Sequence, residues 1–166
     1  LYWSAPAYTP AILLILVLFA FLTPFIQKEE GEEKKYAIEF KDHVRGKLKL
    51  IESTIELYEN RLKGLIPKQR FNVLKQEYIT SLTRINSSIA NSSADVLKSE
   101  PQKKPAIDKI LAMGREMDML LKQLITYYDQ LNVGKIDKRE FEKRRSEAIK
   151  RINAIKQEVE DLLGTI

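Results

Sequence analysis

Few residues in this chain could carry out chemistry as a set. His43 is the only histidine, and the 166 residues include no cysteine. A single histidine cannot supply the paired Glu-x-x-His motifs of a di-iron bundle, and it argues against a Ser-His-Asp triad or a His-based zinc site. The six glycines show neither GxGxxG nor GxxxxGK spacing, the signatures of phosphate-binding loops. We therefore predict a protein that is not an enzyme and holds no cofactor or metal.

The densest cluster of charge is basic and could contact the phosphates of nucleic acid or of anionic lipid. It comprises Lys135, Lys138, Arg139, Lys143, Arg144, Arg145, Lys150 and Arg151. Acidic residues are interleaved with it, several at the spacing of helical ion pairs: Asp137, Glu140, Glu142 and Glu147. The mixture favours a salt-bridged helix face and argues against nucleic acid as the partner.

Two sequons for N-glycosylation lie in the stretch INSSIANSSA, at Asn86 and Asn91. The stretch can also be a polar helix end whose small residues allow close packing. If the sequons are used, they place this part of the chain outside the cytoplasm.

Composition indicates the elements that must position these residues. Charged residues make up 31% of the chain and hydrophobic residues 44%, whereas Gly and Pro number only six each. Such a composition is typical of long helices with a packed core. We therefore expect an all-α protein.

The first 26 residues read as a membrane segment, because none of them is charged. Residues 7–26 form a run of 20 residues, which as a helix rises about 30 Å, the thickness of a hydrocarbon core. Three aromatic residues suited to the headgroup level, Tyr2, Trp3 and Tyr8, lie at the leading end of the run, and Lys28 begins the charged flank behind it. We predict one transmembrane helix, and a cleaved signal peptide or a buried helix of a soluble fold fits less well.

The sidedness signals disagree. Five basic residues follow the apolar run within about 20 positions and none precedes it, so the positive-inside rule places the helical domain in the cytoplasm. Occupied sequons would place it outside. The charge asymmetry favours the cytoplasmic side.

A nearly repeated phrase marks two helix-to-helix turns: GLIPKQRF at residues 64–71 and GKIDKREF at residues 134–141. Gly64 and Gly134 suit the left-handed residue that ends a helix, and the next helix starts at once. Pro67 fits the first turn of the second helix, whereas Asp137 fits an N-cap with Glu140 completing a capping box. Each phrase is therefore predicted to be the tip of an αα-hairpin.

Heptad seams separated by the same 70 residues follow both turns. The later seam has apolar residues spaced alternately four and three apart, with one basic interruption. Its members are Phe141, Arg145, Ala148, Ile152, Ile155, Val159, Leu162 and Ile166, and the earlier positions are Phe71, Lys75, Tyr78, Leu82, Ile85, Ile89, Ser92 and Val96. These are the predicted interaction residues, and they indicate a duplicated hairpin.

The sequence thus divides into five parts. They are a transmembrane helix over 1–26, a charged linker over 27–35, a first hairpin over 36–98, a link over 99–105 and a second hairpin over 106–166. A hairpin buries only one face, so two of them favour an antiparallel four-helix bundle. The alternative is a coiled-coil-like arrangement whose seams close against another chain.

The function that these features favour is that of a single-pass membrane protein acting as an accessory, scaffold or assembly subunit through helix-helix contacts. Its partners would be membrane lipid and either proteins of a membrane complex or copies of itself. The alternative function is an extracytoplasmic stalk, adhesion, virion-surface or sensory bundle anchored by its first helix.

Overall fold

The computed structural model describes the backbone of residues 9–166 and the side chains of residues 31 and 34–166. Within this part of the chain there are four α-helices, one short 3-10 helix and no strand, so the prediction of an all-α helical bundle is confirmed. The elements, in chain order, are α1 (Thr9–Leu62), α2 (Lys68–Ser99), η1 (Pro101–Lys103), α3 (Lys104–Asn132) and α4 (Lys138–Leu163).

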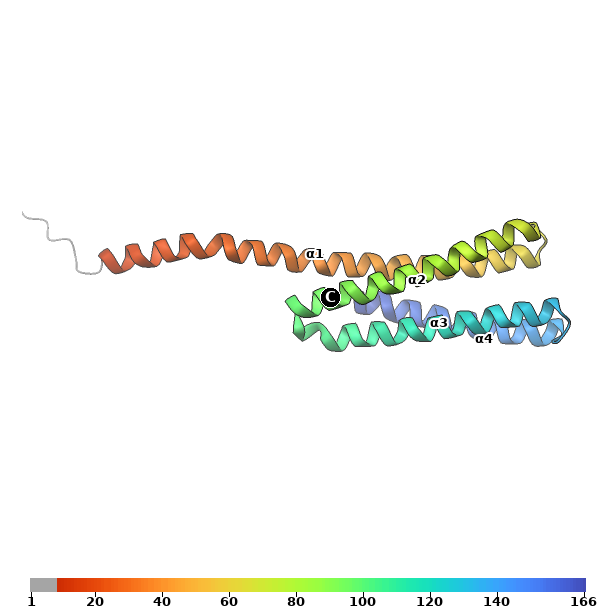
Figure 1. Cartoon of the computed structure of the whole chain (residues 1–166). Coiled ribbons are helices and arrows are strands. Elements are labelled where there is room, and N and C mark those ends of the chain that lie inside the picture. The colour runs from red at the N-terminus through yellow and green to blue at the C-terminus, as the bar shows by residue number, and fades with distance from the viewer. Residues whose placement is uncertain (1–8) are drawn as a thin grey trace, which may run out of the picture.

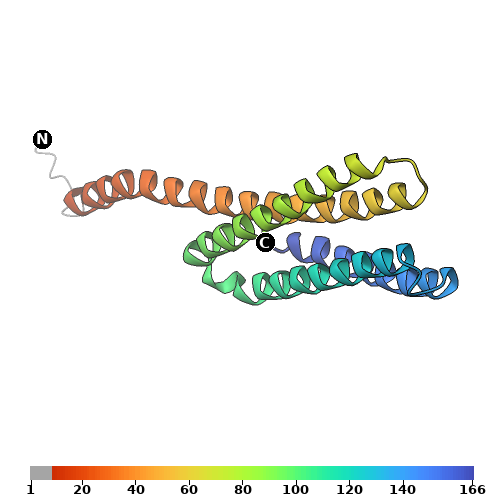
Figure 2. The ribbon, with the colours of Figure 1, turned by 45° about the vertical axis from the view of Figure 1, so that its right-hand side comes forward.

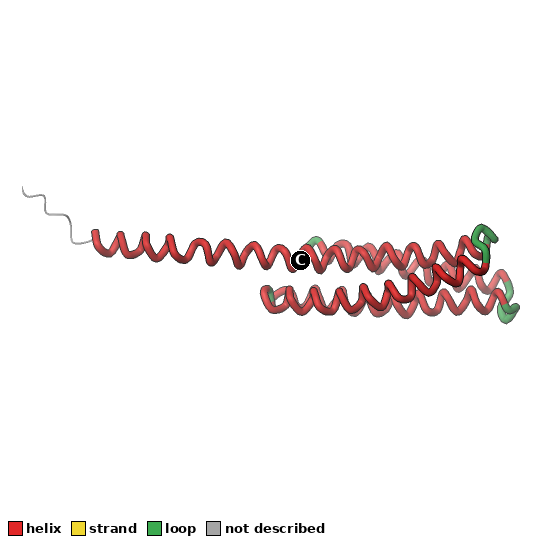
Figure 3. The backbone as a smooth tube through the Cα atoms, turned by 45° about the horizontal axis from the view of Figure 1, so that its top comes forward, coloured by secondary structure: helices red, strands yellow, loops and turns green. Residues whose placement is uncertain are grey.

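The helices form two antiparallel hairpins, α1 with α2 and α3 with α4, that lie against each other (Figure 1). Both hairpin turns lie at the same end of the bundle, as the backbone trace of Figure 3 shows. The chain end lies near η1, because Lys103 Nζ donates a hydrogen bond to the carbonyl of Ile166. Each hairpin therefore runs out from the η1 end and back again.

Helix α1 is much longer than the other three helices, and its N-terminal part extends past the bundle (Figure 2). It continues through residues 27–35, for which the sequence predicts a linker. Lys and Glu make up most of this segment, and both are strong helix formers whose charged chains need no burial. High charge alone therefore does not end the helix.

The predicted transmembrane helix, with Tyr2, Trp3, Tyr8 and Lys28, falls on residues whose side chains lie outside the described part of the structure. Among the residues that are described, no helix is both long and apolar enough to cross a membrane.

The two hairpin turns have nearly the same backbone. Gly64 and Gly134 adopt φ values of 73° and 71°, in the left-handed region that favours glycine. The amide of Leu65 donates to the carbonyl of Asn60, and the amide of Lys135 donates to that of Gln130, an arrangement that closes the end of a helix.

The two following helices start differently. Asp137 is the N-cap of α4, and its carboxylate accepts a hydrogen bond from the amide of Glu140. The Glu140 carboxylate bonds Arg144 one turn later. Pro67 occupies the N-cap position of α2 with extended backbone, and Lys68 is the first helical residue. The N-cap position suits proline because the residue needs no amide hydrogen there.

The core runs along the facing stripes of all four helices. The seam of α4 is buried from Phe141 through Ala148, Ile152, Ile155 and Val159, and its last turn buries Leu163 rather than Leu162. A straight helix has 3.6 residues per turn, so a strict heptad drifts off the core over several turns. This drift accounts for the shift by one residue.

Replacing glycine with alanine is expected to have opposite effects at two positions. Gly134→Ala should lower the free energy of unfolding by about 1–2 kcal/mol, because a Cβ strains the left-handed backbone and contacts nothing nearby. Gly46→Ala should raise the free energy of unfolding by about 0.5–1 kcal/mol, because Gly46 lies in the interior of α1, where alanine is more favourable than glycine. The added Cβ would lie 3.5 Å from Ile85 Cδ1 of α2, an ordinary contact distance. Urea titrations followed by circular dichroism measure both. Two changes of the same sign would contradict the turn geometry.

Candidate functional site

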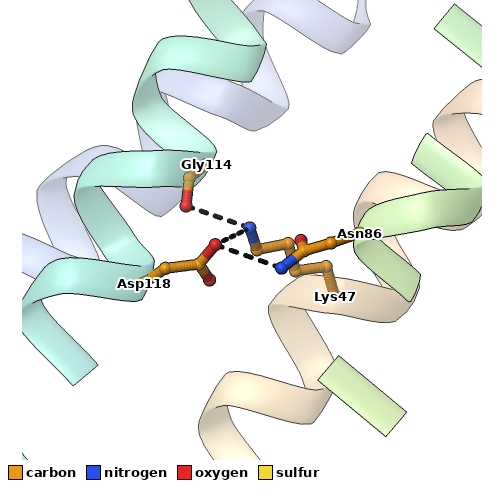
Figure 4. Close-up of polar contacts among 4 residues, drawn as sticks. All are labelled: Lys47, Asn86, Gly114 and Asp118. Carbon is orange, nitrogen blue, oxygen red and sulfur yellow. Dashed lines mark hydrogen bonds and ion pairs between the residues drawn. The ribbon is translucent and has the colours of Figure 1, made fainter. Parts of the chain in front are cut away.

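A polar cluster lies where the two hairpins meet (Figure 4). Lys47 on α1 is only 5% exposed, and its Nζ donates hydrogen bonds to Asp118 Oδ2 at 2.8 Å and to the Gly114 carbonyl at 3.0 Å. Asn86 Nδ2 on α2 donates to the same Asp118 oxygen at 3.2 Å. The cluster joins three helices, and α1 and α2 of one hairpin both contact α3 of the other.

The local sequence brings Lys47 into the core. Seven residues of α1 are buried at alternating spacings of three and four, and this stripe contains the lysine: Ala37, Phe40, Val44, Lys47, Ile51, Thr54 and Tyr58. The ammonium packs directly against Gly114, since a Cβ at that position would lie 3.4 Å from Lys47 Nζ, an ordinary contact distance. Asp118 follows Gly114 by one helical turn and so faces the same way.

A groove of about 350 Å³ adjoins the cluster. Its walls include Ile89, Ile110, Met117 and Val159 beside the three polar side chains. The Asp118 carboxylate balances the positive charge of Lys47, and the Gly114 carbonyl accepts a second hydrogen bond from it. These directed contacts are suited to holding the helices in one register. In the described part of the chain, no group of three or more His, Asp or Glu side chains is arranged to hold a metal ion.

Neither Lys47 nor Asp118 is among the site residues that the sequence predicts. The signal that could have found them is the heptad of residues 37–58, in which a lysine occupies a core position. Asn86, predicted as a glycosylation site, is half-buried and bonded to Asp118, whereas Asn91 is exposed. Of the two sequon asparagines, Asn91 is therefore the more accessible in the folded chain.

A second site joins all four helices near the turns through four aromatic rings in edge-on or tilted contact. Tyr58 lies 5.0 Å from Phe71 and 5.3 Å from Tyr128, and Tyr128 lies 5.0 Å from Phe141, measured between ring centroids. Tyr58 and Phe71 precede Tyr128 and Phe141 by the 70-residue shift, so repeated residues meet across the hairpins. In this cluster, Tyr58 and Tyr128, which occupy equivalent positions of the two predicted repeats, contact each other directly.

The basic residues that interrupt both seams lie beside these rings. Lys75 Nζ is 5.8 Å from the centroid of the Tyr58 ring, a cation–π distance. Its repeat partner Arg145 pairs with Glu59 on α1 and so bridges the hairpins. Burial alone would lower the pKa of Arg145, but the hydrogen bond to Glu59 and the charge of that carboxylate raise it, so the guanidinium remains charged.

Removing the hydroxyl of Tyr58 is expected to stabilise the fold. The hydroxyl is buried and has no hydrogen-bond partner among the described residues, so Tyr58→Phe should raise the free energy of unfolding by about 1 kcal/mol.

The hydroxyl of Tyr58 also predicts a pH dependence. Burial, and then the nearby Asp129 carboxylate, raise its pKa above the ordinary value of 10.0. Only the unfolded state ionises as pH passes 10, so the wild type should lose stability there more steeply than Tyr58→Phe. Urea midpoints measured at pH 8 and above pH 10 test this, and equal slopes would contradict it.

The remaining predicted residues lie as follows. His43 Nδ1 is 3.1 Å from Ser92 Oγ, a contact between α1 and α2. The seam of α4 is buried, as described above. In α2, Ile89, Ser92 and Val96 are buried, but every seam position from Phe71 to Ile85 is only half-buried.

Comparison with protein-family models, with curated proteins and with solved structures gives no match for this chain.

Proposed function

We propose that the protein is a non-enzymatic, single-pass membrane-anchored scaffold or assembly subunit that binds protein partners through a helix face. The observation that carries this proposal is the difference between the two copies of the seam. Phe141 to Ile155 of α4 are covered by the bundle, whereas the equivalent positions of α2 are half-open to solvent.

The open face of α2 is apolar beyond its seam. Ile79 is 42% exposed and lies beside the half-buried Tyr78 and Leu82. Burying such side chains favours association by about 25 cal/mol per Å². A helix laid along α2 would cover them in the way that α3 and α4 cover each other.

The uncharged residues 1–26 support the anchor. Because α1 is helical through residues 27–35, the bundle continues directly from the segment that would enter the membrane, without a flexible break. Charge is scattered over the rest of α1, and no other run of the chain is comparable in length and apolar character.

Cross-linking from single cysteines tests the scaffold, and the absence of native cysteine makes each label unique. Ile79→Cys on α2 should cross-link to a defined helix of a membrane protein or of a second copy in native membranes. Met119→Cys on α3, 60% exposed, is the matched control and should not. Equal cross-linking from both positions, or none from Ile79→Cys, would overturn the proposal.

The anchor has its own test. The full chain should stay with membranes through alkaline carbonate, and Leu14→Lys with Leu18→Lys should release it, because charge at the centre of a span is costly. Release of the unchanged chain would contradict the anchor and leave the α2 face untouched.

The extracytoplasmic stalk or sensory bundle remains the alternative function, favoured by the exposed sequon at Asn91. Intact mass and peptide mapping of the natively purified protein decide between the two. A glycan on Asn91 would place the bundle outside, and a bare asparagine together with the α2 cross-link supports the scaffold facing the cytoplasm.

A further inference from the structure

Positive charge is concentrated at the turn end of the bundle, where the two hairpin turns each contribute basic residues. Residues 61–70 and 133–139 contain seven basic residues and one acidic residue, Asp137. Their net charge of +6 exceeds the +5 of the whole chain, so the rest of the chain is close to neutral. The basic members are Arg61, Lys63, Lys68, Arg70, Lys135, Lys138 and Arg139.

These charges are available to a partner. Among residues 34–166, every ion pair is made by a basic residue outside residues 61–70 and 133–139, and none of the seven lies within ion-pair distance of a carboxylate. The single acidic residue, Asp137, is occupied in capping α4. Six of the seven basic residues are exposed, and Arg61 alone is half-buried, where it donates to the Ile66 carbonyl.

Apolar side chains project from the same end. Leu65 in the first turn is 69% exposed and Val133 in the second is 68% exposed, the two highest values among the large hydrophobic residues described, and Leu62 lies beside them. A shallow cavity joins the two hairpins at this end. It is lined by Glu59, Leu62 and Lys63 of one hairpin and by Leu131, Lys138, Phe141, Glu142 and Arg145 of the other, so its basic side chains outnumber its acidic ones. The two turns therefore form one surface, which we call the basic tip.

We propose that the basic tip, residues 61–70 and 133–139, binds an anionic lipid surface. A lipid surface has a layer of charged headgroups above an apolar layer of acyl chains. The lysine and arginine side chains of the tip can contact the headgroup phosphates, and the exposed leucine and valine side chains can enter the boundary between headgroups and acyl chains. Residues 61–70 and 133–139 contain no aromatic side chain for stacking bases and only one acidic residue. The inference stands on the tip alone and goes beyond the scaffold function.

The tip lies far from the uncharged segment. Residues 27–62 of α1 separate the two, and as a helix they span about 50 Å. The surface that the tip contacts is therefore a second one, away from any bilayer that holds residues 1–26.

A fluorescent label at the tip tests the proposal. The full chain with Val133→Cys, carrying an environment-sensitive dye, is placed in a phosphatidylcholine nanodisc, and vesicles with or without phosphatidylserine are added. Dye emission should shift to the blue with phosphatidylserine vesicles only. The same dye at Met119→Cys on α3, which is similarly exposed, should not respond.

Charge reversal supplies the second arm. Lys63→Glu, Lys68→Glu and Arg70→Glu together should weaken vesicle binding by roughly a hundredfold or more, since each basic residue near the surface contributes about fivefold. Lys49→Glu, Lys122→Glu and Lys150→Glu change the net charge equally on exposed residues elsewhere and should leave binding within a few-fold.

The outcomes separate clearly. A response at Val133 that requires phosphatidylserine and is lost only in the tip variant supports the proposal. An equal response with phosphatidylcholine alone, an equal loss in both triple variants, or no response overturns it. Displacement of the tip from vesicles by a stoichiometric RNA or DNA oligonucleotide would overturn lipid as the occupant. Recovery of the chain in the nanodisc fraction tests the anchor separately.

Discussion

Asp118→Leu is expected to lower the free energy of unfolding by about 2–3 kcal/mol, although it replaces a charge with an apolar side chain. The loss arises at Lys47, whose ammonium is buried and would keep only the Gly114 carbonyl as a partner. Removing one member of a fully buried pair costs about 3–5 kcal/mol. The Asp118 side chain is 33% exposed, so water can recover part of that cost.

A double-mutant cycle identifies the cause. Lys47→Met in the same background removes the stranded charge, so the double variant should recover most of the stability and approach the wild type. Lys47→Met alone should cost less than Asp118→Leu, because Asp118 keeps Asn86 and partial solvent contact. The measurement is urea unfolding of the four proteins in one mild detergent. Additive effects would show that Lys47 and Asp118 do not interact.

Phe141→Ala should cost about 3–5 kcal/mol, the largest effect expected for a single side chain here. Phe141 is fully buried, touches the Tyr128 ring and lies in the core near the turns, so truncation leaves a cavity that fixed helices cannot close. Loss of helical circular dichroism with urea measures the effect.

Its repeat partner provides the control. Phe71 makes the same edge contact, with Tyr58, but is half-buried on the open side of α2. Phe71→Ala should therefore cost only about 1–2 kcal/mol, because water already reaches the ring. Equal losses at the two positions would mean that the seam of α2 is covered in solution, for instance by a second copy.

The hairpins could be predicted because their signals are local. Gly64, Gly134 and Asp137 each satisfy a backbone requirement within a few residues, and a heptad is readable along one helix. Residues 27–35, predicted as a charged linker, lie within α1, because the same Lys and Glu residues that look solvated also propagate a helix. The partial exposure of the α2 seam was not predictable, since this seam has the same spacing as the buried seam of α4.

The polar cluster was missed for another reason. Lys47 and Asp118 are 71 residues apart on different hairpins, and a lysine in a helical pattern ordinarily reads as surface. Only the complete heptad of residues 37–58 places Lys47 in the core, and the match between repeats does not reveal it, because position 117 holds a methionine. A site formed by residues that differ between the two repeats cannot be found by comparing the repeats.

The unbroken helix α1 sets a rotational phase between its two ends. Each residue advances a helix by about 100° and 1.5 Å, so inserting one residue within 27–35 would turn the half-open face of α2 by more than a quarter turn relative to residues 9–26. Seven inserted residues would return it almost to its starting direction while moving the bundle outward by about 10 Å. The number of residues between 27 and 35 thus sets the direction in which the half-open face of α2 points relative to residues 9–26.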